Sequence, residues 1–331
     1  MKRKIPDEIG ILAVLVLVGL ILSLMSPEFF TASNLSTLLL NATVIALLSI
    51  GETFVLLTAG IDLSVGSGIA LSGVLSALIL ENHGSIWLSL IVAVISTLLM
   101  GLFNGLIIHY VKVPPFIVTF ATMSVAASIP MIVTQANPIA ITQESFGNIG
   151  SGYLLGVPVP VIILVVVAIF AYILLAKTVV GMQIYAVGGN RESARLAGVN
   201  TARVDLLVYI VSGFTSGVCG IIDASRLMSG YPTAGSGNDL FFSIAAAVVG
   251  GVSLFGGIGS VGGALIGAVL IGTISDGLNI LNVSSYWQPL VIGVIILIGV
   301  TFDTLRTSQR LNLSFWSVLS SRLKGRTQPL S

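Results

Sequence analysis

Long apolar segments alternate with short polar stretches along almost the whole chain. A membrane-spanning helix needs roughly 20 mainly apolar residues, so the pattern predicts about ten transmembrane helices. The expected segments are 9–25, 41–59, 67–80, 86–110, 116–133, 159–176, 206–227, 242–252, 260–281 and 287–302. The predicted fold class is therefore all-α, a polytopic membrane protein.

Composition and charge support this interpretation. Hydrophobic residues make up 55% of the 331 residues and charged residues only 8%, whereas about a quarter of the residues in a soluble domain are charged. Ten crossings with both termini in the cytoplasm place every Lys and Arg except Arg226 on the cytoplasmic side, as the positive-inside rule requires. We therefore expect one transmembrane domain over 1–305 and a basic cytoplasmic tail over 306–331.

The first segment resembles a signal peptide in its basic start and apolar core. Its core is long, however, and no small-residue cleavage site follows it. We expect a retained span. The single cysteine, Cys219, excludes an intrachain disulfide and a zinc-finger site, and His83 and His109 lack the spacing of metal ligands, so no metal site is predicted.

A helix break is predicted around Asp62. The stretch 60–68 combines four glycines with Asp62 and Ser64, residue types that end one helix and cap the next. In a membrane, such a break is tolerated where protein or a watery cavity satisfies the freed backbone groups. Asp62 is thus either a helix cap in a tight loop or part of the lining of a transport pathway.

Other acids lie within or beside the apolar segments. Glu52, Asp223 and Asp276 need a partner, a proton or a watery cavity if they lie deep in the bilayer. Asp223 lies three residues before Arg226, the spacing of an intrahelical ion pair. The Gly- and Pro-containing stretch 231–240 is predicted to be an external loop, in which Asp239 is either inert or meets an external partner.

The charged stretch 181–205 differs from its surroundings. Gly188 and Gly189 predict a turn, Asn190 a helix cap, and Gly198 the end of a short polar helix. This helix is too short and too charged to span a membrane, so it is either a solvated connector or a docking surface for a soluble partner. The residues of the expected docking helix are Asn190, Arg191, Glu192, Ala194, Arg195, Leu196, Ala197 and Gly198.

The glycines after position 256 match the sequence of a nucleotide-binding pattern but lack its structural context. Gly257, Gly259 and Gly262 match the dinucleotide fingerprint, but no strand precedes them and no acid follows at the required distance. Gly259, Gly263 and Gly267 are four apart and predict close helix packing instead. No Gly-Lys-Ser/Thr phosphate-binding loop is present, so this chain is not expected to bind ATP by that motif.

Several motifs together resemble the ribose-type permeases of bacterial ABC importers. They are 57–67, 185–190, 197–199, 232–237, 250–257 and 277–281, which extend in order over nearly the whole chain. Members often carry Glu-Leu-Asp followed by small apolar residues where this chain has Asp239-Leu240-Phe241, so the second acid of that motif is missing here.

The resemblance implies a permease of the bacterial inner membrane that pairs with a second copy or a paralogue. A periplasmic sugar-binding protein delivers the substrate, and a partner ATPase subunit binds ATP and Mg²⁺, while this chain holds no cofactor and contacts no nucleic acid. The helix from Asn190 to Gly198 is then the coupling helix that docks on the ATPase. Residues expected along the sugar pathway are Asp62, Ser64, Phe116, Thr119, Phe120, Phe241, Phe242 and Asn279, and Asp239 is expected to contact the binding protein.

Other functions fit parts of the pattern. An ion-coupled secondary transporter would use Glu52, Asp62 or Asp276 as its ion site. An integral-membrane enzyme would need a cluster of catalytic acids or metal ligands, which the sequence does not show. A permease for branched-chain amino acids is a closer alternative, although the segments around Asp62 and Asn190 resemble those of the sugar permeases.

Overall fold

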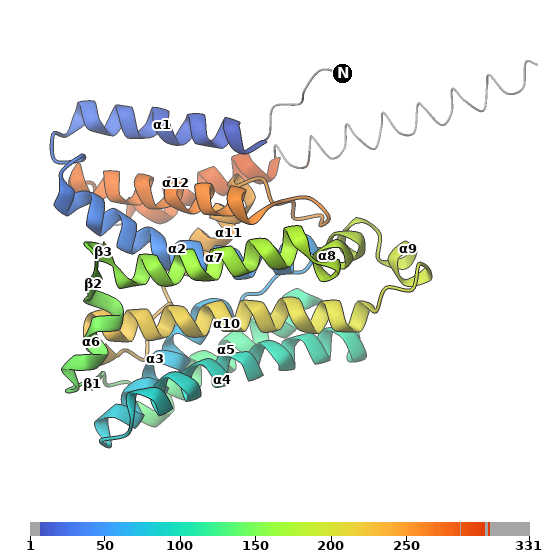
Figure 1. The fold of residues 1–331 in the computed structure, drawn as a ribbon, viewed down its shortest axis with the longest axis horizontal. Helices are drawn as coiled ribbons and strands as arrows, with labels where there is room; N and C mark the ends of the chain where they lie inside the picture. Colours follow the sequence, from blue (N-terminus) through green and yellow to red (C-terminus); the bar gives the residue numbers. More distant parts are fainter. Residues whose placement is uncertain (1–6, 285, 302–303, 305–331) are drawn as a thin grey trace, which may run out of the picture.

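The computed structural model describes residues 7–284, 286–301 and 304. It is built almost entirely from helices (Figure 1). They are α1 (Asp7–Met25), α2 (Ala32–Leu57), α3 (Val65–Glu81), α4 (Ile86–Leu106), the π-helical η1 (Ile107–Val111), α5 (Pro115–Thr134), α6 (Glu144–Ser151), α7 (Val159–Lys177), α8 (Val179–Gly189), α9 (Arg191–Leu196), α10 (Thr201–Leu227), α11 (Asp239–Val249) and α12 (Val261–Ile280), followed by a helix over Trp287–Thr301.

The predicted class, an all-α polytopic membrane protein, is confirmed. In the described part of the chain, seven helices are long and apolar enough to cross a membrane, and four shorter apolar helices accompany them. The second predicted segment begins too late, because α2 starts at Ala32, where the Thr31 hydroxyl accepts a hydrogen bond from the Asn34 amide and caps the helix. The number of crossings stays a prediction, and the basic tail over 306–331 lies outside the described residues.

The polar stretch between α5 and α7 contains structure that the sequence pattern did not predict. Strand β1 (Ile139–Ala140) pairs antiparallel with β4 (Ser229–Gly230), and β2 (Tyr153–Leu154) pairs with β3 (Val157–Pro158). Helix α6 is fixed to α10 by Ser225, whose hydroxyl donates to the Phe146 carbonyl at 2.6 Å and accepts from the Gly150 amide at 2.7 Å. These elements close the end of the bundle at which α10 finishes (Figure 1).

Helices α2 and α10 form the centre of the bundle. In the most apolar 18-residue stretch of each helix, 78% of α2 and 72% of α10 is buried, compared with 0% of α1 and 22% of α7. Close approach of α4 to α10 depends on Gly101, because a Cβ there would lie against the backbone carbonyl oxygen of Tyr209 and 2.8 Å from its carbonyl carbon. Small residues allow such backbone contact between membrane helices.

The predicted break falls between the end of α2 and the start of α3. There the Asp62 carboxylate accepts hydrogen bonds from the Ser64 amide at 2.9 Å, the Ser64 hydroxyl at 2.5 Å and the Ser212 hydroxyl of α10 at 2.8 Å. Asn104 of α4 donates to the Ser64 hydroxyl at 3.0 Å. Protein groups rather than a cavity therefore satisfy the polar atoms of this break.

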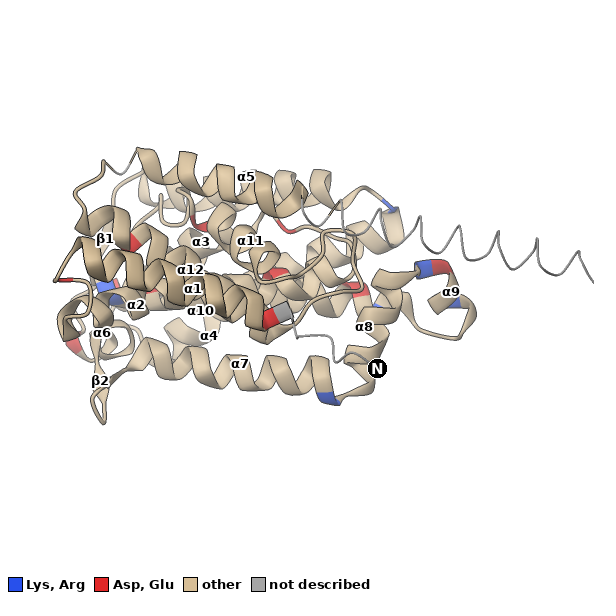
Figure 2. Ribbon diagram, turned by 90° about the horizontal axis from the view of Figure 1, so that it is seen from above, with Lys and Arg blue, Asp and Glu red and all other residues tan. Residues whose placement is uncertain are grey.

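The two ends of the bundle differ in charge. At one end, which we call the α9 end, α7 finishes at Lys177, α10 starts near Arg203, and α9 contributes Arg191 and Arg195. Basic residues gather around this end, and few lie at the other (Figure 2). Arg226 lies in the last turn of α10, at the opposite end.

Candidate functional site

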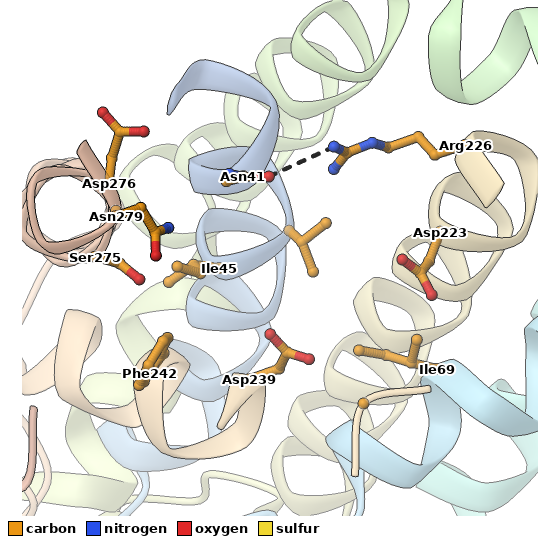
Figure 3. A pocket seen from close by; sticks show the side chains of 13 residues that line it. Asn41, Ile45, Ile69, Asp223, Arg226, Asp239, Phe242, Ser275, Asp276 and Asn279 are labelled. Atoms are coloured by element: carbon orange, nitrogen blue, oxygen red, sulfur yellow. Dashed lines mark hydrogen bonds between the residues drawn. The ribbon is translucent and has the colours of Figure 1, made fainter. Parts of the chain in front are cut away.

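A polar cavity of about 250 Å³ lies between α2, α3, α10, α11 and α12 (Figure 3). It includes Arg226, in the last turn of α10, and therefore lies toward the end of the bundle opposite α9. Its lining residues are Asn41, Val44, Ile45, Ile69, Asp223, Arg226, Gly235, Asp239, Phe242, Gly272, Ser275, Asp276 and Asn279. Two other cavities, of about 540 and 400 Å³, are lined mainly by aliphatic and aromatic side chains. The polar lining therefore distinguishes this cavity in a protein made mostly of apolar helices.

Helical spacing directs the lining side chains into the cavity. On α12, positions 272, 275, 276 and 279 follow the i, i+3, i+4, i+7 pattern of one helix face, and on α2 positions 41, 44 and 45 do the same. Asp223 and Arg226 are one turn apart on α10, and Asp239 begins α11. Ile69 of α3 completes the lining, so five helices contribute to the site.

Hydrogen bonds hold several of these side chains in place. Arg226 reaches toward Asn41, with 3.5 Å between Nη2 and Oδ1 (Figure 3). Asp276 Oδ2 accepts from Asn34 Nδ2 at 2.9 Å, and Asn279 Oδ1 accepts from Gln288 Nε2 at 2.7 Å. The lining is therefore partly preorganised.

The cavity has the chemistry of a site for a small, hydroxyl-rich molecule. Asp223, Asp239 and Asp276 offer carboxylate acceptors, and Arg226 offers guanidinium donors. Phe242 adds an aromatic surface, which suits the apolar face of a sugar ring. The cavity volume of about 250 Å³ is below the roughly 300–1,000 Å³ typical of sites for drug-sized ligands and is compatible with a small solute.

The structure brings together only some of the residues predicted for the sugar pathway. Phe242 and Asn279 line the cavity, and so does Asp239. The predicted residues outside its lining are Asp62, Ser64, Phe116, Thr119, Phe120 and Phe241.

Those other residues lie in two different environments. Asp62 and Ser64 are fully buried in the helix break, and the Thr119 hydroxyl donates to the Pro115 carbonyl at 2.9 Å within α5. Phe116 and Phe120 stack with ring centroids 6.1 Å apart on a side of α5 where both remain at least half exposed. Phe241 is 54% exposed, whereas its neighbour Phe242 on α11 is buried, because consecutive helix positions face different directions.

The expected ion pair on α10 does not form among the described residues. No nitrogen of Arg226 lies within ion-pair distance of Asp223, because the guanidinium extends toward Asn41 on α2 instead. Arg226, Asn41 and Ser275 are cavity residues that the sequence reasoning did not select. The helical spacing of polar residues around Asp276, together with the isolated position of Arg226 in the charge pattern, was the signal for them.

The predicted docking helix corresponds to α9. Asn190 caps it, accepting a hydrogen bond from the Ser193 amide at 2.8 Å, and Gly198, with φ of +85°, follows its end. Gly188 and Gly189 were predicted to form a turn, but they are the last two residues of α8. A Cβ at position 188 would collide with the Leu57 carbonyl oxygen. Glycine at this position therefore allows α8 to continue past the end of α2.

The charged residues of α9 have different environments. Arg195 and Glu192 pair on the surface at 2.7 Å, and this hydrogen bond lowers the pKa of the Glu192 carboxyl. Arg191 turns inward and makes two hydrogen bonds, of 2.7 and 2.8 Å, to the Asp205 carboxylate, which raises the pKa of the Arg191 guanidinium. Leu196 is 75% exposed, whereas Ala194 is buried.

The glycines predicted to pack helices separate into two groups. Gly263 and Gly267 lie in α12, and a Cβ on either would collide with α11 and the residue after it, at the carbonyl oxygens of Gly250 and Ala246. Ser260 caps the start of α12, since its hydroxyl accepts a hydrogen bond from the Gly263 amide at 3.0 Å. Gly259 therefore lies before the helix, with a φ of +146°. The single helical face predicted for all three is therefore wrong for Gly259.

Comparison with known proteins places the chain in a family. A protein-family model described as "Branched-chain amino acid transport system / permease component" matches residues 34–300. The ribose import permease RbsC of Haemophilus influenzae is 39% identical over 93% of this chain and 96% of its own, and that of Bacillus subtilis is 40% identical over 90% and 93%. The D-allose permease AlsC of Escherichia coli is 36% identical over 90% and 92%. No solved structure gives a significant match.

The apolar helices and the family match together define a multi-pass membrane permease. The chain belongs to the family of permease components of ABC importers, which includes the ribose-type permeases that its motifs resemble.

Proposed function

We propose that this chain is the translocation subunit of an ATP-driven importer for a monosaccharide and that the polar cavity lies on the sugar pathway. The observation that carries the proposal is the cavity itself, because its carboxylates, amides and Arg226 can bind hydroxyl groups within an otherwise apolar bundle. The names of the relatives, which refer to ribose, D-allose and L-arabinose, support a simple sugar as the substrate.

The proposed mechanism is alternating access in a dimer of this chain or with a paralogue. A partner ATPase subunit binds ATP and Mg²⁺ and docks at the α9 end, and a binding protein delivers sugar at the cavity end. The concentration of basic residues around α9 supports a cytoplasmic position for that end, with both termini in the cytoplasm, according to the positive-inside rule (Figure 2). Asp62, buried in the helix break, has a structural role in this proposal.

Substitution of Asp239 tests the pathway. In proteoliposomes containing the permease, its ATPase subunit and saturating sugar-loaded binding protein, Asp239→Asn should lower the rate of sugar uptake about ten- to a hundredfold, since a hydrogen bond to a charged group contributes about 1.5–3 kcal/mol. Glu81→Gln is the matched control, because Glu81 is an exposed acid outside the cavity lining.

The same assay separates the competing functions. Unchanged uptake in Asp239→Asn would remove the cavity from the pathway. Uptake driven by a proton or sodium gradient without the ATPase would identify an ion-coupled transporter. Transport of leucine in preference to ribose, allose and arabinose would identify an amino-acid permease.

Charge reversal on α9 tests ATPase docking. The Arg195 side chain is 62% exposed, and its one ion pair among the described residues is with Glu192 on the same short helix. Its guanidinium is therefore accessible to a partner. Arg195→Glu should reduce uptake at least about tenfold, as expected for an arginine at the centre of an interface, without reducing the amount of permease in the membrane. Lys177→Glu reverses an exposed charge at the same end and should have little effect; equal uptake in both variants would contradict the docking role of α9.

A further inference from the structure

A buried carboxylate connects three elements at the α9 end. Asp205 of α10 is only 2% exposed, and its Oδ1 and Oδ2 accept the two hydrogen bonds from Arg191 of α9. Asp205 Oδ2 also accepts from Nδ1 of His109, which lies in η1, at 2.7 Å. One carboxylate therefore ties α9 and the end of α4 to the start of α10.

Helix α9 depends on these contacts for its position. It has six residues, and an isolated helix shorter than about 12–15 residues is marginal in water. The bidentate bond from Arg191 to Asp205 is the form of ion pair that fixes orientation as well as distance. The position and orientation of α9 are therefore set to a large extent from α10.

The other end of α10 forms part of the cavity. Asp223 and Arg226 line the cavity and belong to the same uninterrupted 27-residue helix as Asp205. At 1.5 Å per residue, about 27 Å of helix axis separates Asp205 from Asp223. Serine hydroxyls along α10 bind the helix break, with Ser212 donating to Asp62 and Ser216 donating to the Val65 carbonyl at 2.5 Å. A movement of one end of this helix is thus transmitted along its whole length.

We propose that Asp205 is a positioning residue that clamps the ATPase-docking helix α9 to α10, and that α10 acts as the rigid connection between the ATPase contact and the polar cavity. This inference rests on the proposed function. His109 is the second anchor of the clamp, and it holds the end of α4 to the same carboxylate. A movement of α9 then changes the position of Asp223 and Arg226 through the backbone of α10.

Two cysteine reporters in the full complex test the clamp. Leu196→Cys on the exposed face of α9 reports docking through cross-linking to the ATPase subunit, and Ser275→Cys in the cavity reports its accessibility to a soluble thiol reagent with and without ATP. The native Cys219 is fully buried and does not interfere. Asp205→Asn should reduce the ATP-dependent change in labelling at position 275 about tenfold, and uptake per ATP hydrolysed by a similar factor.

Matched variants separate the clamp from general damage. Arg191→Gln removes the same ion pair from the α9 side and should reproduce the effect. Arg191→Lys keeps the charge but loses the bidentate geometry, so its effect should be intermediate. Arg203→Gln removes an exposed charge of α10 and should leave both the labelling change and the uptake per ATP intact. If position 196 cross-links to the ATPase subunit but Asp205→Asn and Arg191→Gln both behave like Arg203→Gln, the clamp role of Asp205 is contradicted, while the docking of α9 on the ATPase is retained. If position 196 does not cross-link in the parent protein, the docking function itself fails.

Discussion

Valine at position 101 should prevent α4 from packing against α10 and should unfold most of the protein in detergent. Even a Cβ at this position meets the backbone of Tyr209, which cannot move without displacing α10. Overpacking costs about 1–3 kcal/mol when side chains can adjust, and more when backbone must shift. We therefore expect Gly101→Val to lower the free energy of unfolding by about 3 kcal/mol or more, measured by denaturation of the purified permease in SDS–detergent mixtures.

Gly10→Val provides the control. Gly10 also lies in an apolar helix, but no heavy atom lies within 4 Å of a Cβ added there. Its stability should match that of the parent protein. A stable Gly101→Val protein would show that α4 and α10 are not in backbone contact.

Asp62→Ala should be almost as damaging, through loss of the buried acceptor at the helix break. Three donors, the Ser64 amide, the Ser64 hydroxyl and the Ser212 hydroxyl, lose their partner. Each unsatisfied buried donor costs about 1–3 kcal/mol, so the free energy of unfolding should fall by about 3 kcal/mol or more. Asp62→Asn keeps one acceptor oxygen and should lose roughly half as much.

Asp223→Asn is the informative comparison for Asp62. Asp223 lines the cavity, and its carboxylate makes no hydrogen bond to another described side chain or backbone group, so the substitution should lower sugar uptake and leave stability within about 0.5 kcal/mol. The opposite result, a stable Asp62→Ala protein with impaired uptake, would place Asp62 on the pathway after all.

The buried polar groups show why the sequence left the role of Asp62 open. A Gly-rich stretch with Asp62 and Ser64 predicts a break, but the same residues suit a cap and a pathway lining equally well. The decision depends on Ser212 and Asn104, which come from α10 and α4. Contacts between residues so far apart in the chain depend on how the helices pack and leave no local pattern.

The cavity illustrates the same limit. Phe242 and Asn279 were predicted for the sugar pathway and do line the cavity, together with Asp239, which was expected to contact the binding protein instead. Phe116 and Phe120 were predicted by the same reasoning and lie on a half-exposed face of α5. An aromatic residue in an apolar helix has no local feature that distinguishes a cavity-facing from a lipid-facing position, because both environments favour it.

The sequence by itself determined the membrane class, most of the helices, the break near Asp62, the family and the short capped helix α9. These follow from hydropathy, glycine and cap residues and motif order, which act over a few neighbouring residues. Only the tertiary structure decided which helix faces meet: the pairing of both Arg191 and His109 with Asp205, the turn of Arg226 away from Asp223 toward Asn41, and the polar cavity formed from five helices. The physical reason is that an amphipathic pattern identifies the polar face of a helix but does not identify the neighbouring helix that this face contacts.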